Sequence, residues 1–308
     1  MRIIISGSTG LIGSALVKSL ITDGHHVTRL VRRGSRQPEA PTSSIPQLSE
    51  VIWDPQKGIL NLRDVEGHDA VVNLAGENIA QGRWNEEKKR RIHDSRIDSS
   101  KLLVKVLGEL RVPPKVVISA SAVGYYGSHH KREVLTEQSP AGDDFLARVC
   151  VDWESAFEPL ATKSIRTVLT RFGIVLSSQG GALAQMLTPF KLGVGGKLGS
   201  GDQYMSWITL VDAVGVIRHA LDNKSVTGPI NSVAPTPVTN SEFTAELGKA
   251  LSRPALLTVP AFALSLMFGE IADAGLLASL RVVPERLTTL GYKFRFPELG
   301  GALKSVLG

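Results

Sequence analysis

The sequence lacks the residues that mark several classes of protein. It has one cysteine, Cys150, among 308 residues, which excludes an intrachain disulfide framework and fits a reducing compartment such as the cytoplasm. Its Cys and His residues form no cluster with zinc spacing, so we expect no metal site. No apolar run is long enough to span a bilayer, because the most apolar stretch after the N-terminal segment, 255–268, contains a proline and predicts a buried helix. We therefore expect no membrane partner.

The composition is that of a globular chain with a mild excess of positive charge. Hydrophobic residues make up 43% of the sequence and charged residues 21%, which is enough for one large α/β domain or for a nucleotide-binding domain with a smaller lobe. The net charge of +6 gathers around 88–91, where nearby acids offset it, so we expect no nucleic-acid partner. Glycines interrupt the apolar N-terminal segment, and we interpret this segment as a strand and a helix rather than a signal peptide.

A glycine-rich turn lies near the N-terminus. An apolar run, 2–6, precedes it and a helical pattern, 11–23, follows. Backbone N–H groups at such a helix start attract an anion, and glycines let a pyrophosphate and the helix approach the backbone closely. The spacing Gly-x-x-Gly-x-x-Gly resembles that of short-chain dehydrogenase/reductases, in particular their extended, epimerase-like members; an ordinary strand–helix turn is the alternative. The predicted cofactor-binding residues here are Gly7, Ser8, Thr9, Gly10, Leu11, Ile12 and Gly13.

The end of the second predicted strand favours NADP(H) over NAD(H). Dinucleotide-binding folds usually place an acid there, on the ribose hydroxyls, but no Asp or Glu occurs between Val27 and Pro38. Arg32 and Arg33 stand there instead, and arginine pairs with a 2′-phosphate that an acid would repel. The alternative is that these arginines belong to a solvated loop.

Strand-like and helix-like patterns alternate through the first half of the chain. This alternation predicts right-handed crossovers and an α/β fold with a doubly wound parallel sheet, the Rossmann arrangement. The expected strands are 3–6, 27–31, 51–53, 70–74, 116–119 and 167–172, and the expected helices are 11–22, 85–110 and 144–160.

The alternation of strand and helix patterns ends at about residue 180, and glycines then cluster between 193 and 201. A strand at 230–233 and helices at 240–251 and 260–280 are expected there. We predict a dinucleotide-binding domain at 1–180, to which the chain returns within 204–235. A smaller C-terminal substrate lobe at 181–308 is expected to close a cleft over the strand ends.

A polar segment follows the fourth predicted strand. It resembles the superfamily's Asn-Ala-Ala-Gly segment, which supports the sheet and lines the cofactor cleft; a simple tight strand exit is the alternative. The residues matched to it are Asn73, Leu74, Ala75 and Gly76. Glu77 and Asn78 come next and are predicted to face the substrate cleft.

The segment 116–127 resembles the Ser-Ser-x-x-Val-Tyr-Gly segment of extended members. By that match Ser121 takes the catalytic serine position, with Ser119 as second choice, and its hydroxyl can donate to a substrate oxygen. Tyr125 or Tyr126 would flank the substrate and supply the proton. The alternative is that the tyrosines pack at the strand exit.

The superfamily's proton-transfer pair, Tyr-x-x-x-Lys, is absent from the whole sequence. In that family the tyrosine relays the proton, and the lysine lowers its pKa and holds the nicotinamide ribose. The matching helix places Leu146 at the tyrosine position and Cys150 at the lysine position. Bringing a tyrosine pKa from about 10 to about 7 takes roughly 4 kcal/mol, which no residue evident in the sequence supplies. Cys150 is either a buried, inert thiol or an unusual acid or nucleophile.

Trp207 precedes a helix that we expect Thr209 to cap, with Asp212 in its first turn. The indole either walls the substrate cleft or packs in the core.

Taken in order, these motifs make the chain similar to epimerase-family proteins of the YfcH type, which are atypical extended short-chain dehydrogenase/reductases. The resemblance covers essentially the full chain. It implies NADP(H) as cofactor, a C-terminal DUF1731-like segment at about 256–303 and, in extended members, a homodimer formed through two helices. Some relatives are linked to division of plastids or cyanobacterial cells. The other segments that carry the resemblance are Trp53-Asp54-Pro55, Arg83-Trp84-Asn85, Trp153-Glu154, 171–176, 189–193 and 199–201.

The sequence leaves two functions open. In the first, the chain is an NADP(H)-dependent oxidoreductase, similar to nucleoside-diphosphate-sugar epimerases, that acts on a small polar carbonyl or carbinol. In the second, it is a non-catalytic NADP(H)-binding regulator or redox sensor, which the missing Tyr-x-x-x-Lys pair favours.

Overall fold

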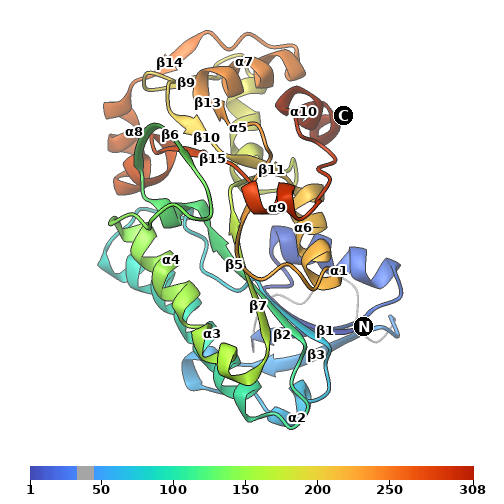
Figure 1. Ribbon diagram of the computed structural model, residues 1–308. Helices are drawn as coiled ribbons and strands as arrows, with labels where there is room; N and C mark the ends of the chain where they lie inside the picture. Colours follow the sequence, from blue (N-terminus) through green and yellow to red (C-terminus); the bar gives the residue numbers. More distant parts are fainter. Residues whose placement is uncertain (33–44) are drawn as a thin grey trace.

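One large sheet organises the chain (Figure 1). The computed structural model describes residues 1–32 and 45–308, and of 129–132 the backbone alone. Seven parallel strands pair in the order β12-β7-β5-β4-β1-β2-β3, which is the doubly wound α/β sheet predicted from the sequence. Their bounds are β1 Arg2–Ser6, β2 His26–Arg32, β3 Leu48–Trp53, β4 Ala70–Asn73, β5 Val116–Ala122, β7 Arg166–Phe172 and β12 Gly228–Ser232.

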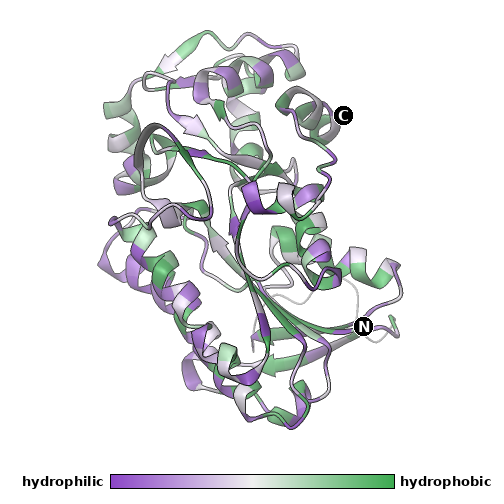
Figure 2. Cartoon of the chain, viewed as in Figure 1, coloured by the Kyte–Doolittle hydropathy of each residue, from purple (hydrophilic) through white to green (hydrophobic). Residues whose placement is uncertain are grey.

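Both faces of this sheet are buried, as the apolar runs of its strands require. Side chains alternate along β1: Ile3 and Ile5 pack in one hydrophobic cluster, whereas Ile4 packs in another. The first cluster includes residues of α1 and α6, and the second includes residues of α3 and α4. In Figure 2 the central strands are mostly in the green of hydrophobic residues. The helices of these two layers are α1 Leu11–Thr22, α2 Leu62–Val65, α3 Glu86–Glu109, α4 Phe145–Ser155 and α6 Leu210–Asp222.

The order of the strands fixes where a ligand can bind. The chain reverses direction across the sheet between β1 and β4, so the connections that leave these neighbouring strands run to opposite faces. In open α/β sheets the crevice at such a switch point, outside the carboxyl ends of the strands, is the usual ligand site. The turn after β1 and the segment after β4 meet there.

The C-terminal part of the chain builds a third hydrophobic cluster, the C-terminal hydrophobic cluster, above that edge of the sheet. Its largest buried residues include Trp207 and Phe243. Short strand pairs β8–β11, β9–β14, β10–β13 and β6–β15 connect this part. The remaining elements are β6 His129–Leu135, β8 Ile174–Leu176, α5 Gly181–Lys191, β9 Gly196–Leu198, β10 Tyr204–Met205, β11 Trp207–Thr209, β13 Val238–Thr239, α7 Asn240–Leu251, β14 Leu257–Val259, α8 Ala261–Phe268, β15 Ser279–Val282, α9 Glu285–Thr289 and α10 Leu299–Leu307.

The predicted helix 260–280 is interrupted at Gly269 and is wrong at its C-terminal end, and the burial predicted for 255–268 is wrong as well. Helix α8 ends at Phe268, before Gly269 with its φ of +67°. A π-helical turn follows over Ala272–Leu276, and only 279–280 of the predicted range lie in a strand, β15. Only Leu264 of α8 is buried, whereas Phe262 and Leu266 are each 74% exposed. Because α8 is apolar all round but has neighbours on one side only, a hydropathy pattern could not reveal its exposure.

Candidate functional site

The glycine turn between β1 and α1 is packed tightly against the end of β4. Gly7 has a φ of +65°, and a Cβ there would lie 2.4 Å from the carbonyl oxygen of Leu74. A Cβ on Gly13 would lie 2.2 Å from the carbonyl oxygen of Gly7. A side chain at position 7 or 13 would therefore push backbone apart, and both glycines are required for the turn to close.

The start of α1 carries a buried donor that lacks a partner. The Ser8 side chain is buried, and its Oγ has no hydrogen-bond partner within the described residues. Gly10 is the N-cap and offers no side-chain cap to α1. A hydroxyl and backbone N–H groups at the positive end of a helix dipole suit a phosphate. Of the other predicted residues, Thr9 is exposed and Leu11 and Ile12 are half-buried.

The predicted arginine positions lie at the end of β2. Arg32 is the last residue of that strand and is exposed, whereas Arg33 lies outside the described residues. The pKa of the Glu77 carboxyl is lowered, mainly by the hydrogen bond from Lys88, and the charge of Arg32 contributes to the shift. Arg32 ends β2 and Glu77 follows β4, so both lie at the sheet edge that holds the glycine turn.

Asn73 holds the strand ends together. Its Oδ1 accepts a hydrogen bond from Ser6 at 2.6 Å, and its Nδ2 donates to Ser100 at 3.3 Å and to Ser119 at 3.4 Å. The fully buried amide thus links β1, β4, β5 and α3. Beyond it, Leu74 and Ala75 are half-buried and Gly76 is exposed.

Ser121 belongs to a buried hydrogen-bond network. Its Oγ donates to Oε1 of Glu154 at 2.6 Å. Arg171 binds the same carboxylate with two bonds, from Nε at 2.8 Å and from Nη2 at 2.7 Å. The arginine and glutamate side chains are 3% and 10% exposed. The structure thus fixes the Ser121 hydroxyl by an ion pair between α4 and β7.

The two predicted tyrosines have different environments. Tyr126 is fully buried, and its hydroxyl donates to Asn231 at 2.7 Å and accepts from Arg171 at 3.1 Å. Burial raises the pKa of Tyr126 to about 12. Tyr125 is half-buried, with the Arg171 guanidinium 3.4 Å from the centre of its ring. The packing alternative therefore describes Tyr126, and the Tyr126 hydroxyl is engaged inside the protein.

The two α4 residues at the matched tyrosine and lysine positions, Leu146 and Cys150, are not polar proton carriers. A Cβ built on Gly124 would contact Leu146 at 3.4 Å and Cys150 at 4.0 Å, so both residues face the turn that contains Tyr125. Burial raises the pKa of the Cys150 thiol to about 12, which keeps it neutral. The inert-thiol interpretation of Cys150 fits this environment.

The predicted substrate residues are spread apart. Glu77 pairs with Lys88 at 2.7 Å, and Asn78 uses its backbone carbonyl to accept a bond from the same lysine. Trp207 is fully buried in the C-terminal hydrophobic cluster, where its Nε1 donates to Thr236. Of the two places left open for Trp207, this burial matches packing in the core and not the wall of the substrate cleft.

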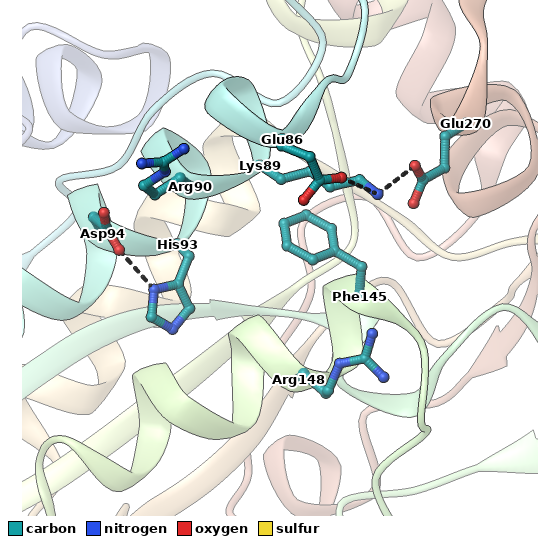
Figure 3. Close-up of a pocket in the computed structure, with 8 residues that line it drawn as sticks. All are labelled: Glu86, Lys89, Arg90, His93, Asp94, Phe145, Arg148 and Glu270. Carbon is teal, nitrogen blue, oxygen red and sulfur yellow. Dashed lines mark hydrogen bonds and ion pairs between the residues drawn. The ribbon is translucent and has the colours of Figure 1, made fainter.

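A charged pocket lies away from these residues (Figure 3). Lys89 of α3 pairs there with Glu270 at 2.6 Å, and its ammonium lies 5.6 Å from the centre of the Phe145 ring. His93 binds Asp94 at 2.9 Å. None of the predicted cofactor or catalytic residues lines it. The lining residues are Glu86, Lys89, Arg90, His93, Asp94, Phe145, Arg148 and Glu270.

Sequence reasoning missed Glu154, Arg171 and Asn231 as parts of the site. Arg171 lies inside a strand predicted to be buried, and a buried charge requires a partner. The position of Arg171 in a strand therefore indicates that it has a partner, but the sequence does not show that this partner is Glu154 of α4.

Known proteins resemble this chain over nearly its whole length. The profile of the NAD dependent epimerase/dehydratase family matches residues 3–233, and a domain of unknown function, DUF1731, matches residues 259–306. "Epimerase family protein Mb2239" from Mycobacterium bovis is 44% identical over 97% of this chain and 95% of its own. Human "Epimerase family protein SDR39U1" is 38% identical over the full length of both chains.

Solved structures are similar to the whole fold, among them one that contains NADPH. The crystal structure of human epimerase family protein SDR39U1 (isoform 2) with NADPH superposes with a TM-score of 0.86 at 38% identity, over 99% of each chain.

Proposed function

This chain belongs to the NAD dependent epimerase/dehydratase family, and from that premise we propose that it is an NADP(H)-dependent oxidoreductase acting on a small polar carbonyl or carbinol. The observation that carries the proposal is the glycine turn, where Gly7 and Gly13 leave no room for a Cβ and the buried Ser8 hydroxyl has no partner within the described residues. NADPH in the crystal structure of the human relative supports it.

The residues present fit such a cofactor. Its phosphates would lie on the N-terminus of α1 beside Ser8, and its 2′-phosphate would lie at the end of β2 near Arg32. The other half would extend over β4, where Ala75 and Gly76 leave the backbone accessible. When bound, the nicotinamide supplies or accepts the hydride.

Ser121 and Tyr125 are our candidates for handling the proton. Because the Ser121 hydroxyl donates to Glu154, its lone pairs are left to accept a hydrogen bond from a substrate hydroxyl. Tyr125 follows four residues later, and its ring lies against the guanidinium of Arg171, the residue that also binds Glu154. Tyr126 is excluded from this role because its hydroxyl is buried on Asn231.

A turnover screen with matched variants tests this function. Oxidation of NADPH would be followed with a panel of carbonyls and nucleotide sugars. With any substrate that reacts, Ser121→Ala and Tyr125→Phe should each lower kcat by roughly 10²-fold or more. Tyr126→Phe is the control and should retain turnover. Activity that survives Ser121→Ala and Tyr125→Phe would sink the assignment of these residues.

A second function is favoured by a specific observation. Ser121 is only 3% exposed, Tyr126 is fully buried, and Cys150 is neutral, so the described residues offer few accessible proton carriers. These features suit a regulator or redox sensor that binds NADP(H) without turning it over. Tight NADPH binding with no turnover across the panel would support it, and ready hydride transfer would rule it out.

A further inference from the structure

The guanidinium of Arg96, a residue of α3, lies against the chain segment that follows β4. Arg96 donates from Nη1 to the carbonyl of Ile92 at 2.8 Å and from Nη2 to the carbonyl of Glu77 at 3.2 Å. A Cβ built on Gly76 would lie 3.2 Å from the Arg96 Cζ, so the absence of a side chain at 76 leaves the space that this group needs.

Arg96 forms no ion pair within the described residues, 1–32 and 45–308, although the charge of Glu77 acts on it from beyond ion-pair distance. Arg96 lies 5.1 Å from the centre of the Trp153 ring, and burial lowers its pKa, although a guanidinium remains charged at neutral pH. Its two hydrogen bonds leave other N–H donors unused. A partly buried cation with unused donors is suited to an oxygen-rich ligand.

Arg96 and the predicted catalytic residues meet at Cys150. The charge of Arg96 acts on the buried Cys150 thiol, which faces the turn that contains Tyr125. Cys150 carries no charge of its own here. The other charged side chains here, Arg171 of β7 and Glu154 of α4, pair with each other, so the positive charge without an ion-pair partner in the described chain comes from Arg96 of α3.

The strand order of the sheet indicates which part of a bound dinucleotide would lie beside Arg96. β1 is flanked by β2 on one side and by β4 and β5 on the other. A dinucleotide whose phosphates lie on the turn after β1, and whose 2′-phosphate lies at the end of β2, must extend its other half over β4 and β5. We propose that Arg96 binds this nicotinamide half of NADP(H) by donating to the oxygens of its ribose. This inference rests on the cofactor binding proposed above.

A binding experiment with two ligands tests it. Isothermal titration would measure NADPH and 2′,5′-ADP, which has the adenosine phosphates and lacks the nicotinamide nucleotide. Arg96→Met should weaken NADPH binding roughly tenfold or more, the loss expected for charge-assisted bonds, and should leave 2′,5′-ADP binding unchanged. Arg96→Lys should recover part of the NADPH affinity. Arg90→Met, an exposed arginine of the same helix, should change neither ligand.

Two results would overturn the inference. If Arg96→Met binds NADPH with unchanged affinity, Arg96 does not contact the cofactor. If Arg96→Met and Arg96→Lys both lose affinity for NADPH and for 2′,5′-ADP equally, Arg96 only supports the fold around Gly76. Circular dichroism of each variant shows whether it is folded. If the unaltered protein binds neither ligand, the proposed cofactor binding itself fails, which is a separate result.

Discussion

Ser8 is the residue that most directly indicates a ligand, because its hydroxyl is buried and has no partner within the described residues. A buried hydroxyl without a partner costs about 1–3 kcal/mol, and in the described chain nothing offsets this cost for Ser8. We expect Ser8→Ala to bind NADPH about tenfold more weakly, because a bond to a phosphate is lost. The thermal unfolding temperature of the ligand-free protein should stay the same or rise.

Ser14→Ala is the matched control, since that hydroxyl is exposed on the next turn of α1 and donates to Leu11. It should leave NADPH affinity unchanged. If Ser8→Ala binds NADPH as well as the unaltered protein, Ser8 does not contact the phosphates.

At the residue scale, the sequence predicted where glycine was needed but not which polar groups would meet. Gly7 and Gly13 could be found because their spacing follows from one local turn. The contact of Ser121 with Glu154 joins residues 33 positions apart, and that of Tyr126 with Asn231 joins residues 105 apart. Such partners depend on how α4 and β12 pack, which a local pattern does not contain.

Among the elements, α6 fixes the chain segment that precedes α10. The Asp212 carboxylate is buried and accepts hydrogen bonds from the backbone N–H groups of Arg295 and Phe296 and from the Tyr292 hydroxyl. We expect Asp212→Ala to lower the free energy of unfolding by about 3 kcal/mol, because these buried donors lose their acceptor. Urea unfolding would measure it.

Asp212→Asn should cost less, since its amide oxygen still accepts part of these bonds. A loss below about 0.5 kcal/mol in Asp212→Ala, the usual size for a surface change, would contradict this description of the segment.

Helices α3 and α4 are joined by a titratable contact. His93 of α3 bonds to Asp94 and to Asp152 of α4. Burial opposes the charge of His93, but the bonds and charges of the two aspartates outweigh it and raise the pKa. The resulting stabilisation is fully present below the unfolded-state pKa of about 6.5 and is lost as pH rises through the higher folded-state pKa.

His93→Gln should therefore lower the free energy of unfolding at low pH and have less effect in alkaline buffer. The side chain is 36% exposed, so solvent screening limits the loss to about 1 kcal/mol or less. Urea unfolding at about pH 5.5 and about pH 8.5, well to either side of the ordinary histidine pKa, measures both values. An equal loss at the two pH values would argue against the charged contact.

Elements with a regular period were predicted well, and those that depend on a distant neighbour were not. The strands of the large sheet and helices α1, α3 and α7 lie close to their predicted positions. Strand β15 was missed because its pairing partner, β6, lies more than a hundred residues earlier. Helix α8 was predicted to be buried because hydropathy does not reveal how many elements surround a helix.

In the whole molecule, the sheet positions one candidate site from three separate segments. The turn after β1, the end of β4 and the end of β5 meet on one edge because of the strand order.

Within the described part of the chain, no helix has the length and apolar character needed to cross a membrane. The homodimer considered from the sequence, formed through α3 and α4, remains a proposal that the mass in solution would test.

The central claim is that this edge binds NADP(H) with a preference for its 2′-phosphate. The most direct measurement is the dissociation constants of NADPH and NADH for the unaltered protein and for Arg32→Glu. We predict that the unaltered protein binds NADPH at least about tenfold more tightly than NADH, and that Arg32→Glu loses most of this preference, since a carboxylate repels the phosphate. Equal affinities for the two cofactors in the unaltered protein, or no binding of either, would contradict the account.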